Sequence, residues 1–212
     1  MFYIKAFVFS PIQENTYVLY NEAGGAILID PGCYFSQERD ELAAFLAHSK
    51  LQPESLLNTH GHLDHIFGNK WAAEQFGLQP HIHPFEQPVL DRAAASGLMW
   101  NLPFAQYSGT YSWLQEGQEI RLGTDVLQVI FTPGHSPGHV CFYCAKQGFV
   151  IGGDVLFRES IGRTDLPGGN HNQLLQTIRQ QLFVLPDETV VYSGHGQPTT
   201  IGHEKSFNPF LT

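Results

Sequence analysis

Residues 59–65 constrain the fold of this chain more than any other segment, because three histidines and an aspartate fall within six consecutive positions. In an extended His-x-His sequence both side chains point to the same side, so one ion can bind His60 and His62 together. Asp64 and His65 follow a local bend and can serve a second ion. Imidazole and carboxylate together suit zinc, iron or manganese. The segment therefore predicts a metal-binding loop.

Matching residues occur at three other places along the chain: His135, Asp154 and His195. Each follows an apolar, strand-like run and is flanked by glycine or proline, so each is expected in a loop at the end of a strand. A lone histidine or aspartate of this kind is usually a surface or turn residue. Three of them in addition to the histidine-rich loop are typical of a scaffold that brings loops together, and the set predicts a metal centre.

The apolar pattern predicts an α+β fold with two groups of strands and helices between them. Strands are expected at residues 2–9, 15–20, 26–29, 55–58, 119–122, 126–131, 140–143, 149–152 and 189–192. Helices are expected at residues 36–49, with Ser36 as N-cap, and at 66–76, 85–95 and 173–185. This grouping suggests two β-sheets packed back to back with helices outside.

Composition narrows the function classes further. With 212 residues, 42% of them hydrophobic and only 15% charged, the chain can form one large domain over residues 1–212. Its formal net charge of −9 disfavours nucleic acid and anionic membranes as partners. We see neither a membrane span nor a signal peptide. Three cysteines do not suit a disulfide framework, so a cytoplasmic protein is expected.

The order of these residues resembles the metallo-β-lactamase superfamily, and the resemblance covers residues 2–210. It implies an αββα four-layer sandwich of two mixed β-sheets flanked by helices, with two metals at one edge. It implies a first metal on His60, His62 and His135, a second on Asp64, His65 and His195, and Asp154 as the bridge. Asp30, after the third predicted strand, matches a family carboxylate that braces the metal loop.

Two segments are similar to short forms of glyoxalase II within that superfamily. One runs from Gly153 through Arg163 to Gly169, and the other from Gly194 to Phe210. Glyoxalase II hydrolyses thioesters of glutathione, typically S-D-lactoylglutathione. The resemblance thus implies a small-molecule thioester substrate. It also implies two divalent metal ions, with zinc favoured and iron or manganese as the alternatives.

The implied reaction is hydrolysis by a hydroxide that bridges the two metals. Zinc lowers the pKa of bound water to about 7, so hydroxide forms near neutral pH. It would attack the thioester carbonyl, while Asp64 orients it as well as binding metal.

Arg163 is the candidate for substrate binding. It falls nine residues after Asp154, where the longer glyoxalase II enzymes place a basic residue against glutathione. Its guanidinium can grip a carboxylate, or it can pair with Asp165 or Glu159. The longer enzymes carry a tyrosine soon after the residue matching His195 and an added C-terminal helical domain. Neither is expected here, so glutathione, coenzyme A and bacillithiol all stay open as the thiol carrier.

Other reactions fit the same ligands. Persulfide dioxygenases of the superfamily keep most of the pattern and use one iron, whereas lactonases and β-lactamases are hydrolases. Metal content, oxygen consumption and a lactone assay would distinguish them. The Leu-Pro-Gly-Gly sequence at residues 166–169 looks more like the short hydrolases.

Some neighbouring residues are left out of the ligand set. His139 shares a loop with His135 and is a candidate for supporting a ligand from behind. Residues 81–83, a second His-x-His, read as a strand, and Cys141 and Cys144 read as buried core. The aromatic residues between 104 and 113 are read as a satellite core rather than as the substrate mouth.

Overall fold

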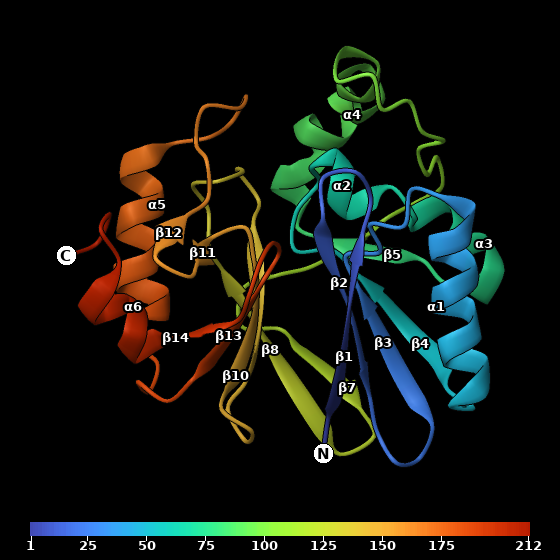
Figure 1. Ribbon diagram of the computed structural model, residues 1–212, viewed down its shortest axis with the longest axis horizontal. Coiled ribbons are helices and arrows are strands. Elements are labelled where there is room, and N and C mark those ends of the chain that lie inside the picture. The colour runs from blue at the N-terminus through green and yellow to red at the C-terminus, as the bar shows by residue number, and fades with distance from the viewer.

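A computed structural model describes all 212 residues, and it shows two six-stranded β-sheets packed face to face with helices on both outer faces (Figure 1). The α+β fold and the αββα sandwich predicted from the sequence are confirmed. No helix combines the length and the hydropathy needed to cross a bilayer.

The first sheet comes from the N-terminal half and has the order β1-β2-β3-β4-β5-β6. Its strands are β1 Tyr3–Phe9, β2 Glu14–Tyr20, β3 Gly25–Ile29, β4 Gln52–Leu57, β5 Pro80–Ile82 and β6 Ser112–Trp113. β1, β2 and β3 are antiparallel, whereas β3 to β6 run parallel. Parallel neighbours need crossover connections, and helices supply them here.

The second sheet comes from the C-terminal half and has the order β14-β13-β10-β9-β8-β7. Its strands are β7 Glu119–Leu122, β8 Asp125–Phe131, β9 Val140–Cys144, β10 Phe149–Gly153, β13 Val190–Ser193 and β14 Thr199–Thr200. Only β10 and β13 pair in parallel. A separate hairpin, β11 Leu156–Phe157 and β12 Ser160–Ile161, follows β10.

Apolar residues on both faces of the central strands explain the four layers. In β3, Ile27 and Ile29 pack between the sheets, whereas Leu28 packs under the helices. In β10, Ile151 packs between the sheets and Val150 packs under the other helices. Successive side chains of a strand point to opposite faces, so a continuous apolar run must be covered on both sides.

The helices divide between the outer faces and one end of the sandwich. α1 (Ser36–His48) and α3 (Asn69–Phe76) cover the first sheet, and α5 (His171–Thr177) and α6 (Ile201–Phe207) cover the second (Figure 1). α2 (Leu63–Ile66) and α4 (Gln87–Met99), with the short 3-10 turn η1 (Pro84–Glu86), lie at the end of the sheets. A π-helical turn, η2 (Ile178–Leu182), extends α5.

The expected helix over residues 66–76 is in fact two helices, α2 and α3. The helix is interrupted near Gly68, whose N–H donates to the carbonyl oxygen of Pro31 at 2.7 Å. This contact with the turn after β3 ends α2 early and keeps it within the metal-binding loop.

Ser36 is not the N-cap of α1 but its first helical residue, and Phe35 takes the cap position. The Glu38 carboxylate accepts hydrogen bonds from the N–H groups of Tyr34 and Phe35. It also accepts one from Ser10, which links α1 to the turn between β1 and β2.

Replacement of Phe142 by alanine tests the core between the sheets. Phe142 has no exposed surface and lies in the inter-sheet cluster, so we expect the free energy of unfolding to fall by about 3–5 kcal/mol. Urea unfolding of metal-free protein measures this. Phe207, whose side chain is 65% exposed, is the matched control, and its alanine variant should change stability by less than about 0.5 kcal/mol. Equal losses would contradict the packing.

Candidate metal centre

The predicted metal-binding residues meet at one edge of the sandwich because parallel strands end there. His60 follows β4 in the first sheet. His135, Asp154 and His195 follow β8, β10 and β13, which run in the same direction in the second sheet. Loops from both sheets therefore face each other across the core, and side chains from either sheet reach a common point.

His60, His62 and His135 form the first group of three nitrogens, called trio 1 here. The Nδ1 atom of His62 lies 2.8 Å from Nε2 of His135, and Nε2 of His60 lies 3.2 Å from the same atom. Their ligand atoms all fall within 4.8 Å of one another. This spacing lets three neutral imidazoles share one ion.

Asp64, His65 and His195 form the second group, called trio 2. Oδ2 of Asp64 lies 3.2 Å from Nε2 of His195 and 3.7 Å from Nε2 of His65. These ligand atoms also fall within 4.8 Å of one another. Trio 2 combines two imidazoles with one carboxylate, which is a common donor set for catalytic zinc.

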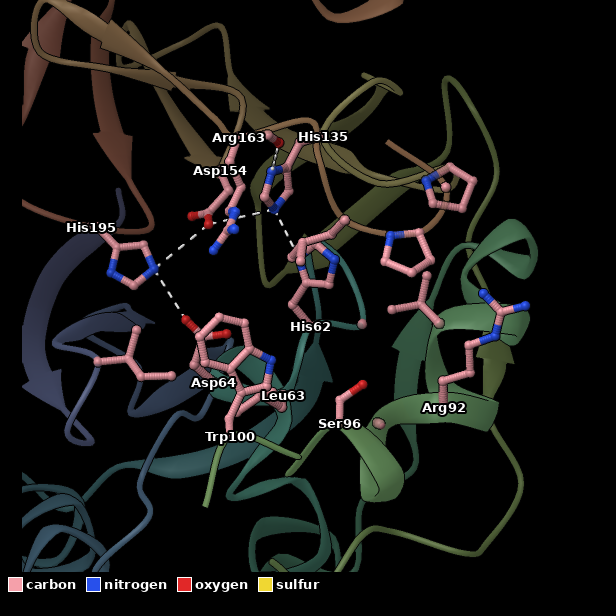
Figure 2. A pocket seen from close by; sticks show the side chains of 18 of the residues that line it. His62, Leu63, Asp64, Arg92, Ser96, Trp100, His135, Asp154, Arg163 and His195 are labelled. Atoms are coloured by element: carbon pink, nitrogen blue, oxygen red, sulfur yellow. Dashed lines mark hydrogen bonds and ion pairs between the residues drawn. The ribbon is translucent and has the colours of Figure 1, made fainter. Parts of the chain in front are cut away.

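Asp154 lies between His135 of trio 1 and His195 of trio 2 (Figure 2). Its Oδ1 is 3.4 Å from Nε2 of His65, and its Oδ2 is 3.6 Å from Nε2 of both His135 and His195. One carboxylate thus touches members of both groups. The structure brings all seven sequence-predicted residues together, with Asp154 at the shared position.

Hydrogen bonds on the outer side of four rings turn their free nitrogens toward the centre. Nδ1 of His135 donates to the carbonyl oxygen of Arg163 at 2.7 Å, and Nδ1 of His195 donates to that of Gln13 at 3.1 Å. The Thr59 hydroxyl lies 3.0 Å from Nδ1 of His60, and Oδ2 of Asp30 lies 3.0 Å from Nδ1 of His65. These partners assign the proton to Nδ1 and leave the Nε2 lone pair facing inward.

Burial and charge differ between the two trios. Burial lowers the pKa of His62 to about 3 and also lowers the pKa of His135, because a dry surrounding disfavours imidazolium. These rings are neutral at pH 7, as metal ligands must be. Burial acts in the same direction on His65, but the carboxylates of Asp154 and Asp64 outweigh it and raise the pKa of His65.

The chemistry of the site fits divalent ions. His65 Nε2 and Asp154 Oδ1 are buried and have no hydrogen-bond partner, although they lie 3.4 Å apart. An unpartnered buried polar atom is costly, and in a folded protein it points to a group that binds something else. Five imidazoles and two carboxylates are donors that zinc, iron and manganese accept.

Asp30 holds the metal-binding loop from behind, as the sequence predicted. Its Oδ1 accepts from the Thr59 N–H at 2.7 Å, and its Oδ2 accepts from the Thr59 hydroxyl at 2.6 Å and faces Nδ1 of His65 at 3.0 Å. The Thr59 hydroxyl in turn lies 3.0 Å from Nδ1 of His60. One carboxylate therefore orients a ring in each trio.

His139 also lies behind the ligands. Its ring stacks on His60 with centroids 5.0 Å apart, and its Nε2 accepts a hydrogen bond from the Asp154 N–H at 3.1 Å. Thr132 contacts its other ring nitrogen at 2.9 Å. His139 is thus placed to hold Asp154 in position.

Sequence reasoning missed two buried carboxylates beside the centre, Glu14 and Glu86. Glu14 lies 4.0 Å from His65, and one of its oxygens has no hydrogen-bond partner. Glu86 accepts hydrogen bonds from both loops that carry trio 1. Glu14 follows the turn between two strands, and Glu86 lies between two prolines. Neither belongs to a sequence pattern that distinguishes it from an ordinary surface glutamate.

A cavity of about 590 Å³ opens beside the metal-binding residues and includes Asp64, Asp154 and His195 in its lining. α4 forms one wall, and the segment after β10 forms the other (Figure 2). Its apolar lining includes Ile12, Val89, Leu102, Phe157, Ile161 and Leu166. A space of this size suits a small organic substrate.

Two arginines line the cavity. Arg163 was predicted from the sequence, and its guanidinium pairs with both oxygens of Asp165 at 2.8 Å and lies 5.9 Å from the ring of Trp100. Arg92, which the sequence did not single out, projects from α4 and forms no ion pair within the chain (Figure 2). Arg92 is therefore the uncompensated positive charge of the cavity.

Apart from His139, the residues left out of the ligand set lie elsewhere. His81 belongs to β5, as expected, whereas His83 follows the strand and is the N-cap of the 3-10 turn η1. Cys141 and Cys144 are free and buried on opposite faces of β9. None of the aromatic residues between 104 and 113 lines the cavity beside the metal centre; Phe104 and Tyr111 pack on a small separate core.

Comparison with known proteins gives a consistent result. Residues 10–195 match the metallo-beta-lactamase superfamily. The probable metallo-hydrolase YqgX of Bacillus subtilis is 37% identical over 204 residues, which cover 95% of this chain and 93% of the relative. Hydroxyacylglutathione hydrolase GloC of Haemophilus influenzae is 33% identical over 201 residues, with coverage of 94% and 93%.

Solved structures agree. The BLEG-1 B3 metallo-beta-lactamase superimposes with a TM-score of 0.91 at 39% identity, covering 99% of this chain and 100% of that one. TTHA1623 in a di-iron-bound form superimposes with a TM-score of 0.88 at 38% sequence identity, covering 98% of this chain and 100% of that one. ETHE1 from Myxococcus xanthus superimposes with a TM-score of 0.80 at 28% identity, covering 99% of this chain and 84% of that one. Together with the two trios at the sheet edge, these matches show that the chain belongs to the metallo-beta-lactamase superfamily.

Proposed function

We propose that this protein is a metal-dependent hydrolase that cleaves a small thioester at a two-metal centre. The observation that carries the proposal is the position of Asp154, within 3.6 Å of imidazole nitrogens from both trios. A carboxylate in this place suits two ions held side by side. The free and buried cysteines support a reducing, cytoplasmic location.

The chain's own residues would hold the ions and position the reactants. His60, His62 and His135 would bind one ion, and Asp64, His65 and His195 the other, with Asp154 between them. Two divalent ions in such a site supply hydroxide at neutral pH and polarise a carbonyl.

Asp64 has a second role in this proposal. Its carboxylate lines the cavity and lies 3.2 Å from His195, so an oxygen of Asp64 can accept a hydrogen bond from the attacking water and orient it. Apolar side chains such as Val89, Phe157 and Leu166 line the space beside Asp64 in which a substrate would lie.

The thioester class is supported by the similarity to a protein named hydroxyacylglutathione hydrolase, at 33% identity over 94% of this chain. The similarity to TTHA1623, described in a di-iron-bound form, supports two metals and makes iron an alternative to zinc. The similarity to a B3 metallo-beta-lactamase makes β-lactam hydrolysis the second candidate.

A substrate panel with metal analysis tests the proposal. Purified protein should hold two zinc or iron ions per chain and hydrolyse S-lactoylglutathione or an acyl-coenzyme A. Removing the metal with a chelator should abolish hydrolysis, and adding it back should restore it. Hydrolysis of a lactone or a β-lactam alone would overturn the thioester assignment. Oxygen consumption with glutathione persulfide and a single iron would favour the dioxygenase alternative.

Replacement of Asp154 by alanine or asparagine should lower metal occupancy and activity together. Replacing a residue that only hydrogen-bonds to a metal ligand typically lowers metal affinity or activity by about 10–100-fold. Loss of the shared carboxylate itself should therefore lower kcat/KM by at least about 100-fold. Metal analysis and steady-state kinetics on the same samples measure both. The control is Asp187→Ala, because Asp187 is exposed and pairs with Lys205 away from the cavity. Full occupancy in the Asp154 variants would refute the bridging position.

Replacement of Arg92 by glutamine tests how the cavity selects substrates. Because Arg92 is the unpaired cation of the lining, kcat/KM for an anionic thioester should fall about tenfold, or about 1.4 kcal/mol. A neutral thioester, S-lactoyl-N-acetylcysteamine, should be cleaved at the wild-type rate. Arg121→Gln is the control, since Arg121 pairs with Glu119 outside the cavity. An equal effect on both substrates would contradict a charge-based role.

A further inference from the structure

Glu86 is a buried carboxylate that the proposed chemistry does not use. It ends the 3-10 turn η1, directly before α4, and has no exposed surface. Its Oε2 accepts from the Gly61 N–H at 2.8 Å. Its Oε1 accepts from the Ser136 hydroxyl at 2.7 Å and from the Gly138 N–H at 2.6 Å. Three donors and no cation surround it, so hydrogen bonds alone satisfy this buried carboxyl group.

The donors lie beside the ligands of trio 1. Gly61 separates His60 from His62, and Ser136 follows His135 directly. One carboxylate therefore joins the loop after β4 in the first sheet to the loop after β8 in the second.

Close backbone packing makes this link rigid. A Cβ atom at Gly138 would lie only 2.7 Å from the Glu86 nitrogen, so η1 lies directly against the loop. On its other side Glu86 leads into α4, which lines the cavity with Val89 and Arg92. The position of this cavity wall is thus tied to the same two loops.

Trio 2 has supports that do not involve Glu86. Asp30 contacts Nδ1 of His65 at 3.0 Å, and the Gln13 carbonyl oxygen contacts Nδ1 of His195 at 3.1 Å. Glu86 contacts neither ring. Loss of Glu86 should therefore loosen one trio and leave the other in place.

We propose that Glu86 is a positioning residue that holds trio 1 in a metal-binding arrangement by joining the two loops that supply it. The inference rests on the proposed two-metal centre. Groups that orient ligands typically change metal affinity by about 10–100-fold, and a site that is loose by an ångström binds poorly.

Zinc titration of metal-free protein against a competing chelator tests the inference without a substrate. Wild-type protein should bind two equivalents. In Glu86→Gln, which places an amide N–H₂ against one of the donors, and in Glu86→Ala, one of the two equivalents should bind about 10–100-fold more weakly. The other should keep its wild-type affinity. Ser136→Ala removes one of the three hydrogen bonds and should give a smaller loss.

Glu204 provides the matched control. It is equally buried and accepts hydrogen bonds from the Glu159 N–H at 2.9 Å, from the Asn208 amide at 2.8 Å and from the Thr199 hydroxyl, all outside the metal loops. Glu204→Gln should lower the melting temperature as Glu86→Gln does, yet bind both zinc equivalents normally.

Two results would overturn the inference. If the Glu86 variants lose thermal stability but bind both equivalents with wild-type affinity, Glu86 only stabilises the fold. If wild-type protein itself binds fewer than two equivalents, the two-metal proposal fails and this inference fails with it. Since Glu86→Gln and Ser136→Ala keep side-chain volume nearly unchanged, they report on affinity even where Glu86→Ala does not fold.

Discussion

The apolar core between the two sheets sets the geometry on which the metal centre depends. Trio 1 takes His60 and His62 from the first sheet and His135 from the second, so the distance between the sheets fixes the distance between these nitrogens. Residues such as Phe142 and Ile29, which have no exposed surface, pack in that space. Because close-packed interiors transmit small displacements, a change in this core moves the ligands even though it touches none of them.

Hydrogen bonds behind the ligands add the precision that packing alone does not give. Asp30 contacts Thr59 and His65, and His139 contacts the backbone of Asp154. The contact of Asp30 with His65 orients that ring, and the contact of His139 holds Asp154 in position. Side chains that are not themselves donors to an ion thus determine where the donor atoms lie.

The sequence predicted the layers and all seven clustered residues, because both are expressed in local patterns. Continuous apolar runs such as β3 and β10 require cover on two faces, and the histidines and aspartates follow such runs directly. The roles of Glu86 and Arg92 were not predicted, because they depend on how segments distant in sequence come together. The short elements β14 and α6 were missed for another reason: two to seven residues show too little periodicity.

For Arg163, the position in the sequence predicted the location of the side chain but not its ion-pair partner. Arg163 lines the cavity, where the resemblance to glyoxalase II implied a basic residue, but its guanidinium is paired with Asp165, which the sequence offered only as one alternative partner.

The walls of the cavity have a consequence for how such a protein changes over generations. They come largely from residues 88–102 and 157–168, segments that contribute no donor atom to either trio. Side chains that line the cavity in these stretches, such as Val89 and Leu166, can therefore vary without removing a donor atom. A lineage built on this plan can change which compounds enter its cavity, while the seven clustered histidines and aspartates are inherited intact.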